Sequence, residues 1–182
     1  MVNVTAKPAT LRRAVARCRV RLDPDTVRAL SSECAIGTAG SWSELAEVAR
    51  LAGIQGAKQA ARLIPLCHPL PIADVDVRLS LQGDGVHVEG ISEVIAQTGI
   101  EMEALTACAI AGLTVLSALH ADRPDASIED LCLWEKRGGR SGTWRRIEEN
   151  LPRAARRLPR PPEPGQADGS RPARGLSQPP SG

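Results

Sequence analysis

The feature that most constrains the fold is a run of sixteen residues, Ala104–Leu119, without a single charged side chain. Small or polar residues interrupt the run at Thr106, Gly112, Thr114 and Ser117. A helix that crosses a bilayer needs about 20 consecutive, predominantly apolar residues. The run is short for that purpose, so it predicts a helix buried in the core of a folded domain.

Two segments alternate between apolar and polar residues, which is the pattern of a strand with one face in the core. In Ala14–Leu22 the even positions are apolar and three of the odd ones are arginine, which predicts a charged face in solvent. In Ile72–Leu81 the odd positions from Val75 onward are apolar. Gly83–Gly85 follows as a turn, and we expect a hairpin whose return strand starts at Val86.

A long helix is predicted between these strands. Ser41 and Glu44 have the S-x-x-E spacing of a capping box, in which a hydroxyl and a carboxylate satisfy free backbone N–H groups. Apolar residues then recur at helical spacing over about residues 43–63, and Pro65 ends the pattern. Two shorter elements are also expected, a helix over Asp23–Leu30 and a strand near Leu131–Trp134. The mixture predicts an α+β fold with an antiparallel sheet.

The net charge of +2 is unevenly distributed along the chain. Residues 151–182 hold six Arg, eight Pro, four Gly and two acidic residues, whereas residues 1–150 hold 17 basic and 19 acidic residues. A mildly acidic folded part argues against a core that binds polyanions, and three Trp without Phe or Tyr provide few stacking platforms. We expect one domain over residues 1–150 and a disordered Pro/Arg-rich tail over residues 151–182. Nucleic-acid binding through the tail is the weaker alternative.

The cysteines and the N-terminus indicate the compartment. Five cysteines are widely spaced, without a C-x-x-C pair, so neither a disulfide framework nor a zinc site is expected. Reduced and mostly buried thiols are the ordinary alternative. The N-terminal residues contain no apolar signal segment. We therefore expect a cytoplasmic protein with no membrane partner.

Core packing alone does not explain four segments. They are GIQGAK ending at Lys58, LIPLCHPL over residues 63–70, TGIEMEALT over residues 98–106 and KRGGRSG over residues 136–142. Imidazole is the side chain most suited to acid–base chemistry near neutral pH, and the prolines on either side of His68 would keep its loop rigid; a packed structural imidazole is the alternative. Glu101 and Glu103 stand at a helix start, where they could serve chemistry or only the helix dipole.

The glycine-rich segment carries three cations, Lys136, Arg137 and Arg140, around two adjacent glycines. Flexible backbone of this kind can point N–H groups at an anion, so the loop could cradle phosphate groups. A solvated basic turn is the alternative.

These segments, with MVNVTAK at residues 1–7, resemble the cyclic pyranopterin monophosphate synthase family of molybdenum cofactor biosynthesis. The resemblance covers about residues 1–145 and leaves out the tail. It implies a ferredoxin-like α+β subunit, with an antiparallel sheet packed against two long helices. It also implies a homohexamer, a trimer of dimers, with the active site at the dimer interface.

The resemblance implies an enzyme, a lyase that acts on a small phosphorylated purine. Its substrate would be cyclised dihydro-GTP (3′,8-cyclo-7,8-dihydroguanosine triphosphate), and its products cyclic pyranopterin monophosphate and pyrophosphate. No metal or redox cofactor is implied. Catalytic roles would fall to His68, Lys136 and His120. Substrate binding would fall to Arg12, Leu66, Cys67, His68, Met102 and Glu103.

The sequence departs from the family pattern at three positions. Trp42, Ser117 and His120 stand where the family has a catalytic Lys, Asp and Lys. An indole supplies neither a positive charge nor an acid–base proton, although His120 could still relay protons. One hypothesis is an enzyme with the standard reaction, or with a related cyclisation on a less phosphorylated nucleotide. The other is an impaired paralogue that binds a pterin-like ligand or joins mixed hexamers with an active sister.

Helix geometry bears on the oligomer. Glu103 and Ser117 are 14 residues apart, which puts them near one face of a helix but roughly 21 Å apart along its axis. One reacting atom cannot contact both ends of such a helix. If both ends belong to active sites, each site must be shared between subunits.

Overall fold

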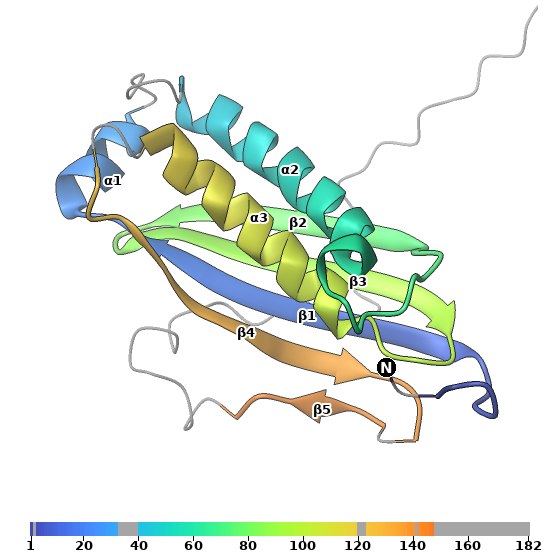
Figure 1. Cartoon of the computed structure of the whole chain (residues 1–182). Coiled ribbons are helices and arrows are strands. Elements are labelled where there is room, and N and C mark those ends of the chain that lie inside the picture. Colours follow the sequence, from blue (N-terminus) through green and yellow to red (C-terminus); the bar gives the residue numbers. More distant parts are fainter. Residues whose placement is uncertain (2, 33–39, 120–122, 141, 148–182) are drawn as a thin grey trace, which may run out of the picture.

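The chain folds into one antiparallel sheet with helices on one face (Figure 1). The computed structural model describes residues 1, 3–32, 40–119, 123–140 and 142–147. Its elements in chain order are β1 (Thr10–Arg21), α1 (Pro24–Ser31), α2 (Trp42–Leu63), β2 (Asp74–Gln82), β3 (Gly85–Ala96), α3 (Glu101–Leu119), β4 (Ser127–Arg137) and β5 (Trp144–Arg145).

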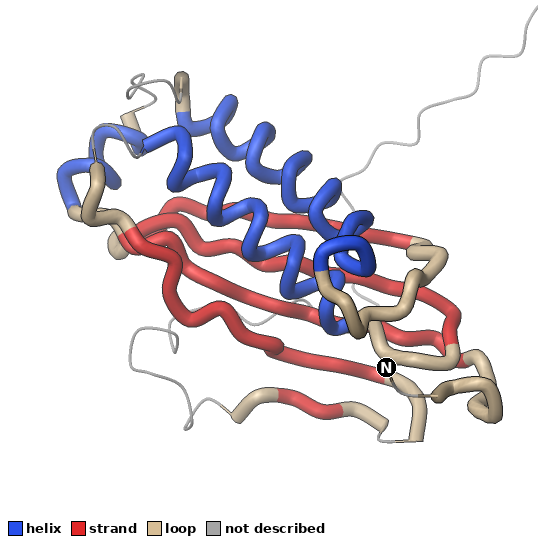
Figure 2. The backbone as a smooth tube through the Cα atoms, viewed as in Figure 1, coloured by secondary structure: helices blue, strands red, loops and turns tan. Residues whose placement is uncertain are grey.

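The strand order is β2-β3-β1-β4-β5, and each neighbouring pair is antiparallel. Without α1 and the short β5, the chain reads β-α-β-β-α-β with the order β4-β1-β3-β2. This is the ferredoxin-like arrangement, and it confirms the α+β class expected from the sequence. Helices α2 and α3 lie side by side on one face of the sheet and run in opposite directions (Figures 1 and 2).

Helix α3 occupies the centre of the core, as its uncharged sequence predicts. It packs against α2 and against strands β1, β3 and β4. Among the described residues it is the one helix long and apolar enough to cross a membrane by length and composition, and in this fold it packs against the sheet instead. Gly53 permits the close contact with α2, because a Cβ at that position would lie 2.8 Å from the Ala107 carbonyl oxygen.

The helix starts follow from local side chains. Ser41 and Glu44 form the expected capping box at the start of α2. Asp23 caps α1 by accepting hydrogen bonds from the backbone amides of Asp25 and Thr26. The predicted hairpin is also confirmed, with β2 and β3 paired from Asp74 to Gly85 along the whole length of β2.

The face of the sheet that α2 and α3 do not cover differs from the sequence-based expectation. The arginines that alternate along β1 were expected in solvent, but Arg17 and Arg19 are buried. Arg17 forms an ion pair of 2.7 Å with Glu89 on β3 and stacks 4.2 Å from the ring of Trp134 on β4. At Arg17 and Arg19 the charged face of β1 is therefore a packed layer of cross-strand ion pairs, whereas Arg21 at the end of the strand is exposed as expected.

The cysteines of the described residues are free thiols. Cys18 and Cys108 are buried in the core, and Cys67 and Cys132 are half-buried. Cys34, His120 and the predicted disordered tail over residues 151–182 lie outside the described residues.

Candidate active site

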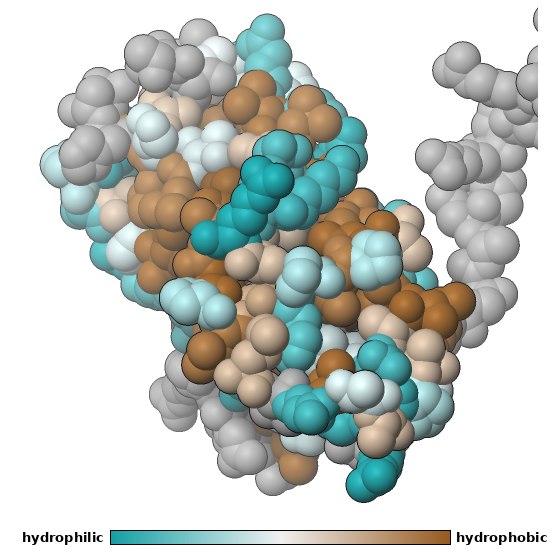
Figure 3. Space-filling view, turned by 45° about the vertical axis from the view of Figure 1, so that its right-hand side comes forward, coloured by the Kyte–Doolittle hydropathy of each residue, from teal (hydrophilic) through white to brown (hydrophobic). Residues whose placement is uncertain are grey.

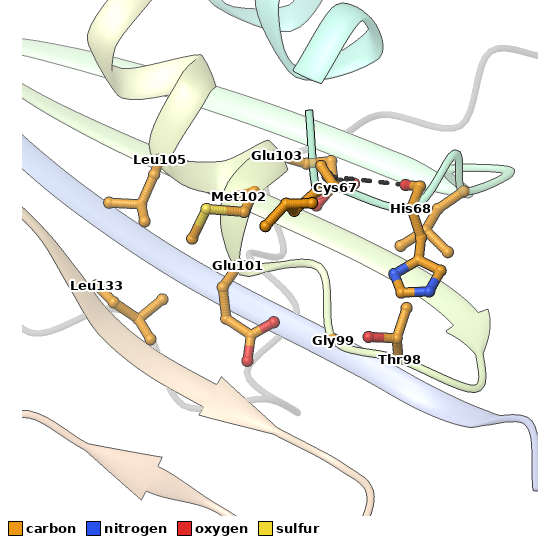
Figure 4. A pocket seen from close by; sticks show the side chains of 11 residues that line it. Cys67, His68, Thr98, Gly99, Glu101, Met102, Glu103, Leu105 and Leu133 are labelled. Carbon is orange, nitrogen blue, oxygen red and sulfur yellow. Dashed lines mark hydrogen bonds between the residues drawn. The ribbon is translucent and has the colours of Figure 1, made fainter. Parts of the chain in front are cut away.

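One edge of the fold gathers three of the four sequence motifs. At this edge α2 ends, α3 begins, β1 begins, and β3 and β4 end (Figure 1). A cavity of about 410 Å³ lies here between the loop after α2, the connection from β3 to α3 and strand β4. We call it the carboxylate cavity; its walls include Leu66, Cys67, His68, Glu101, Met102 and Glu103 (Figure 4).

The loop of residues 64–73 carries His68 into this cavity. It begins where Ile64 caps α2 and its amide donates to the Ala60 carbonyl. The Cys67 amide then donates to the Ile64 carbonyl over 3.0 Å, which closes a tight turn. His68 is half-buried and lines the cavity together with Thr98. The structure thus places His68 where a substrate could meet its imidazole.

Glu103 is the most buried carboxylate of the cavity. Its residue is 3% exposed, although it lies in the first turn of α3. The thiol of Cys67 donates to Glu103 Oε1 over 3.6 Å. Burial raises the pKa of Glu103 above the ordinary value of 4.5, and the thiol only partly opposes this. Glu103 is therefore protonated more readily than an exposed carboxyl group, and can exchange protons with a bound ligand.

Burial and the nearby Glu103 charge raise the pKa of the Cys67 thiol to about 11. Cys67 is therefore a neutral thiol at physiological pH rather than a nucleophilic thiolate. This suits a residue that binds substrate or supports Glu103, and not one that forms a covalent intermediate.

Lys136 is connected to the carboxylate cavity by an ion pair with Glu101. Its Nζ lies 3.5 Å from Glu101 Oε1, and both residues line a small adjoining cavity of about 140 Å³. Glu101 also lines the carboxylate cavity. The Glu101 carboxylate therefore lies between the Lys136 ammonium group and the cavity that His68 lines. Within a single chain, the structure thus places His68 and Glu103 in one cavity and Lys136 in the adjoining one, with Glu101 lining both.

Arg12 lies beside this site and faces another cavity. Its Nε donates to the Ala96 carbonyl over 3.2 Å, and its Nη2 donates to the Gln97 carbonyl over 3.5 Å. The guanidinium is packed against Gly139, where a Cβ would lie 1.9 Å from Nη1. Arg12 lines a cavity of about 400 Å³, which shares Thr98 and Gly99 with the carboxylate cavity. We call it the basic cavity, because its charged lining residues are Lys7, Arg12 and Arg140.

The glycine-rich segment differs from its sequence expectation. Its three cations have different surroundings instead of forming one cluster. Lys136 pairs with Glu101, Arg137 pairs with Glu135, and Arg140 lines the basic cavity. The amides of Gly138 and Gly142 donate to carbonyls within the loop. Gly138 and Gly139 have φ values of 100° and 73°, and their missing side chains make room for Leu11 and Arg12. The loop therefore positions Arg12 instead of offering these two amides to an anion.

The positions that depart from the family pattern lie at the opposite end of the helix layer. Trp42 is the first residue of α2, and Ser117 is in the last turn of α3. Because the two helices are antiparallel, both residues lie far from His68 in the same chain (Figure 1). Trp42 packs against the core, and Ser117 is exposed. The third such position, His120, is outside the described residues.

Sequence reasoning did not assign several residues of the site. Thr98 and Gly99 line both larger cavities, and Glu101 joins Lys136 to the carboxylate cavity. Lys7 and Thr10 line the basic cavity. The position of Lys7 within the N-terminal motif was the one sequence signal for a role in the site. The alternation along β1 predicts strand pairing and gives no indication that Thr10 lines a cavity. Among the described residues no cluster of three His, Cys, Asp or Glu side chains is arranged to hold a metal ion.

Comparison with known proteins agrees with the motifs. A family model described as MoaC family matches residues 1–139. The chain is 49% identical over 151 residues to the cyclic pyranopterin monophosphate synthase of Thermomicrobium roseum, covering 82% of this chain and 88% of that protein. It is 43% identical over 144 residues to the protein of the same name from Dinoroseobacter shibae, covering 78% of this chain and 88% of that protein.

Proposed function

The chain belongs to the MoaC family, and from that premise we propose that it catalyses the reaction for which its relatives are named. It is a lyase of molybdenum cofactor biosynthesis whose substrate is a phosphorylated guanosine derivative. The substrate is cyclised dihydro-GTP, and the products are cyclic pyranopterin monophosphate and pyrophosphate. The observation that carries the proposal is that His68 and Glu103 line one cavity, with Lys136 paired to a second carboxylate of that cavity, Glu101.

The reaction requires proton transfer and the stabilisation of negative charge. Rearranging a purine into a pterin moves protons on and off nitrogen and carbon, which calls for general acids and bases. Forming the cyclic phosphate makes a new P–O bond at the α-phosphorus and breaks the bond to pyrophosphate, whose charge must be stabilised. The carboxylate cavity offers proton-transfer groups, and the neighbouring cations offer charge.

We assign roles accordingly. His68 acts as general acid or base, since imidazole exchanges protons near neutral pH. Glu103, with its raised pKa, exchanges a proton with the ring system. Leu66, Cys67 and Met102 form the walls against which the ring binds. Lys136 is held by Glu101 at the edge nearest the phosphates.

A complete active site requires residues from more than one subunit. Two of the family's remaining catalytic positions, Trp42 and Ser117, lie at the far end of α2 and α3, and the third, His120, lies outside the described residues. We propose a homo-oligomer, a hexamer as the resemblance implies, in which the far end of one copy completes the cavity of another. Exposed apolar side chains support this: Val48, Leu51 and Leu113 are each more than half exposed on the helix layer, and Figure 3 shows apolar surface over it. We also propose a cytoplasmic location, without nucleic-acid or membrane partners.

One observation favours a second candidate function. The far end lacks the lysine and aspartate of the family at Trp42 and Ser117. A chain of this kind could bind a pterin-like ligand without turnover or join a hexamer with an active sister. The intact motifs around His68 and Glu103 favour the enzyme, because a decayed pocket would lose them as well.

A turnover assay tests the proposal. Purified full-length protein is incubated with cyclised dihydro-GTP, and pyrophosphate and the pterin product are measured over time. We expect both products in equal amounts from the wild-type chain, and neither above background from His68→Ala. Lys58→Gln is a matched control, since Lys58 is exposed on α2 and lines neither cavity. Binding of the substrate without either product would favour the impaired paralogue.

A further inference from the structure

Gly99 lies where three cavities meet. It lines the carboxylate cavity (Figure 4), the basic cavity and the small cavity beside Lys136. Among the described residues, no other one lines all three. Gly99 belongs to the connection from β3 to α3, two positions before Glu101, the first residue of α3. A substitution at position 99 therefore acts at the junction of the three cavities.

The place of a side chain at position 99 is taken by the Glu101 carboxylate. A Cβ atom there would lie 2.5 Å from Cδ and 2.7 Å from Oε1 of Glu101, and closer still to Oε2. Such distances are well below van der Waals contact, so a Cβ atom and this Glu101 conformation exclude each other. The φ of Gly99 lies outside the left-handed range. Position 99 therefore needs a glycine for space and not for its backbone conformation.

The Glu101 carboxylate, folded over Gly99, reaches Lys136. Its Oε1 lies 3.5 Å from Lys136 Nζ, and the ion pair joins the start of α3 to the end of β4. The Glu101 and Lys136 side chains are 26% and 39% exposed, and an ion pair so accessible to solvent contributes little to stability. The consequence of the pair is therefore the position of the ammonium group, and only slightly the stability of the fold.

Glu101 is the one carboxylate in the lining of the small cavity. The charged residues of that lining are one carboxylate and four cations: Glu101, Arg12, Arg13, Lys136 and Arg137. Arg13 and Arg137 have carboxylate partners of their own on the sheet. Without the Glu101 carboxylate, the Lys136 ammonium group would face these cations with no counter-charge in the lining. Repulsion between like charges would then displace it.

We propose that Gly99 is a positioning residue of the active site. Because it has no side chain, it leaves the space that the Glu101 carboxylate occupies, and that carboxylate holds the Lys136 ammonium group beside the carboxylate cavity. Gly99 thus acts through Glu101 and Lys136. This inference rests on the proposed function, which gives Lys136 a role in the reaction.

The crystal structure of full-length Gly99→Ala tests the positioning directly. The added methyl group meets the end of a flexible side chain, so the fold should be kept and the Glu101 carboxylate should turn away. We expect its distance from Lys136 Nζ to exceed about 4 Å, the limit of an ion pair. Glu101→Ala, which only removes atoms, is a second test, and the Lys136 ammonium group should leave its place there too. An ion pair that persists in Gly99→Ala, or an unmoved Lys136 in Glu101→Ala, would overturn the inference.

Gly83→Ala is the matched control. Gly83 lies in the turn between β2 and β3, and a Cβ atom there would have no atom of the described residues within 4 Å. The same methyl group is therefore added away from the three cavities, and the pair of Glu101 and Lys136 should keep its wild-type geometry.

Turnover of cyclised dihydro-GTP shows whether Gly99 acts through Glu101. In the wild-type background, Gly99→Ala should lower kcat about tenfold at a nearly unchanged unfolding temperature, because a displaced Lys136 loses part of its effect. In the Glu101→Ala background the same change should have almost no further effect, since no carboxylate is left to displace. An equal loss in both backgrounds would mean that the new methyl group itself obstructs the cavities, and it would overturn the inference.

The structural and kinetic tests separate this inference from the proposed function. A wild-type chain without turnover, together with a displaced ion pair in Gly99→Ala, would reject the reaction but support the placement of Lys136 by Gly99. Normal wild-type turnover with an unmoved Glu101 carboxylate in Gly99→Ala would reject only the inference.

Discussion

The two ends of the helix layer differ in what they retain. The end where α2 stops and α3 starts carries each described residue that the family resemblance assigns to substrate or catalysis, from Arg12 to Lys136. The end where α2 starts and α3 stops carries Trp42 and Ser117, at positions where the family resemblance implies a lysine and an aspartate. Among the described residues, the substitutions therefore lie at one end, and the other end keeps the side chains that the family resemblance assigns to it.

This difference separates two contributions to catalysis. Within one chain, the intact end supplies a cavity, proton-transfer groups and cations. The altered end is too distant to act on the same cavity, so it can act only on a neighbouring copy. Restoring charges at the altered end should therefore raise the rate of a site that already binds substrate, and a bulky cation there should block that site. Loss of a proton-transfer group at the intact end should nearly abolish the reaction.

The largest effect is expected at His68. His68→Ala should reduce kcat/KM about a thousandfold, because a general acid–base group contributes this order of rate enhancement. His68 is half-buried in a loop, so the variant should unfold at nearly the wild-type temperature. Steady-state pyrophosphate release and thermal unfolding check both statements. A variant with more than a tenth of wild-type activity would contradict the assignment.

A smaller loss is expected at Glu103. Glu103→Gln keeps the shape of the side chain but removes its exchangeable proton, and we expect kcat to fall about a hundredfold with KM nearly unchanged. Met102→Leu is the neighbouring control and should change KM more than kcat, since Met102 only lines the cavity. A fall in substrate affinity without a fall in kcat would make Glu103 a binding residue instead.

The altered end should respond in the opposite direction. Trp42→Lys, Ser117→Asp and His120→Lys together restore the charges of the family pattern, and we expect turnover of the triphosphate substrate to rise about tenfold. The same three changes in a His68→Ala background should give no gain. An unchanged rate in the wild-type background would mean that the altered end does not contribute to the site.

Stability should report the burial of Glu103. Its folded-state pKa is raised above 4.5, so the folded chain binds this proton more tightly than the unfolded chain does. The free energy of unfolding therefore falls as pH rises from about 4.5 through the folded pKa of Glu103. Glu103→Gln removes this contribution and should be less sensitive to pH over that window. Thermal unfolding at a series of pH values measures the difference, and parallel curves for the two proteins would exclude it.

The smallest effect concerns Cys67. With its pKa raised to about 11, the thiol should react with iodoacetamide at pH 7.5 more slowly than the same thiol in the unfolded chain. Cys67→Ser should lower kcat/KM only a few-fold, because a hydroxyl can still donate to Glu103. Rapid alkylation of Cys67 in the folded protein, identified by mass spectrometry, would show that it is a thiolate.

Local patterns in the sequence predict the elements of this fold well. The uncharged run predicts α3, the capping box predicts the start of α2, and the alternation with Gly83–Gly85 predicts the hairpin. Each of these signals depends on residues within one or two turns of one another. The spacing of Glu103 and Ser117 along α3 likewise predicts that one reacting atom cannot contact both ends of the helix.

Contacts between distant residues could not be predicted in this way. Arg17 is buried because Glu89 and Trp134 come to it from other strands, and the alternation of β1 alone puts its charge in solvent. The glycine-rich segment similarly hides the separation of its cations, since Arg137 finds Glu135 on the same strand while Lys136 crosses to Glu101. The motifs predict candidate site residues, and the fold shows which of them line the carboxylate cavity and which line the basic cavity.

Mixing two inactive variants tests most directly whether one active site combines the two ends of different subunits. His68→Ala disables the intact end, and Ser117→Arg places a large cation at the exposed altered end. The two proteins are unfolded together, refolded as a mixture and assayed for pyrophosphate release from cyclised dihydro-GTP. We expect each variant alone to be inactive and the mixture to recover activity, because some sites then pair a normal cavity with a normal altered end. Activity of the mixture no greater than that of the separate variants, or full activity of Ser117→Arg by itself, would contradict a shared site.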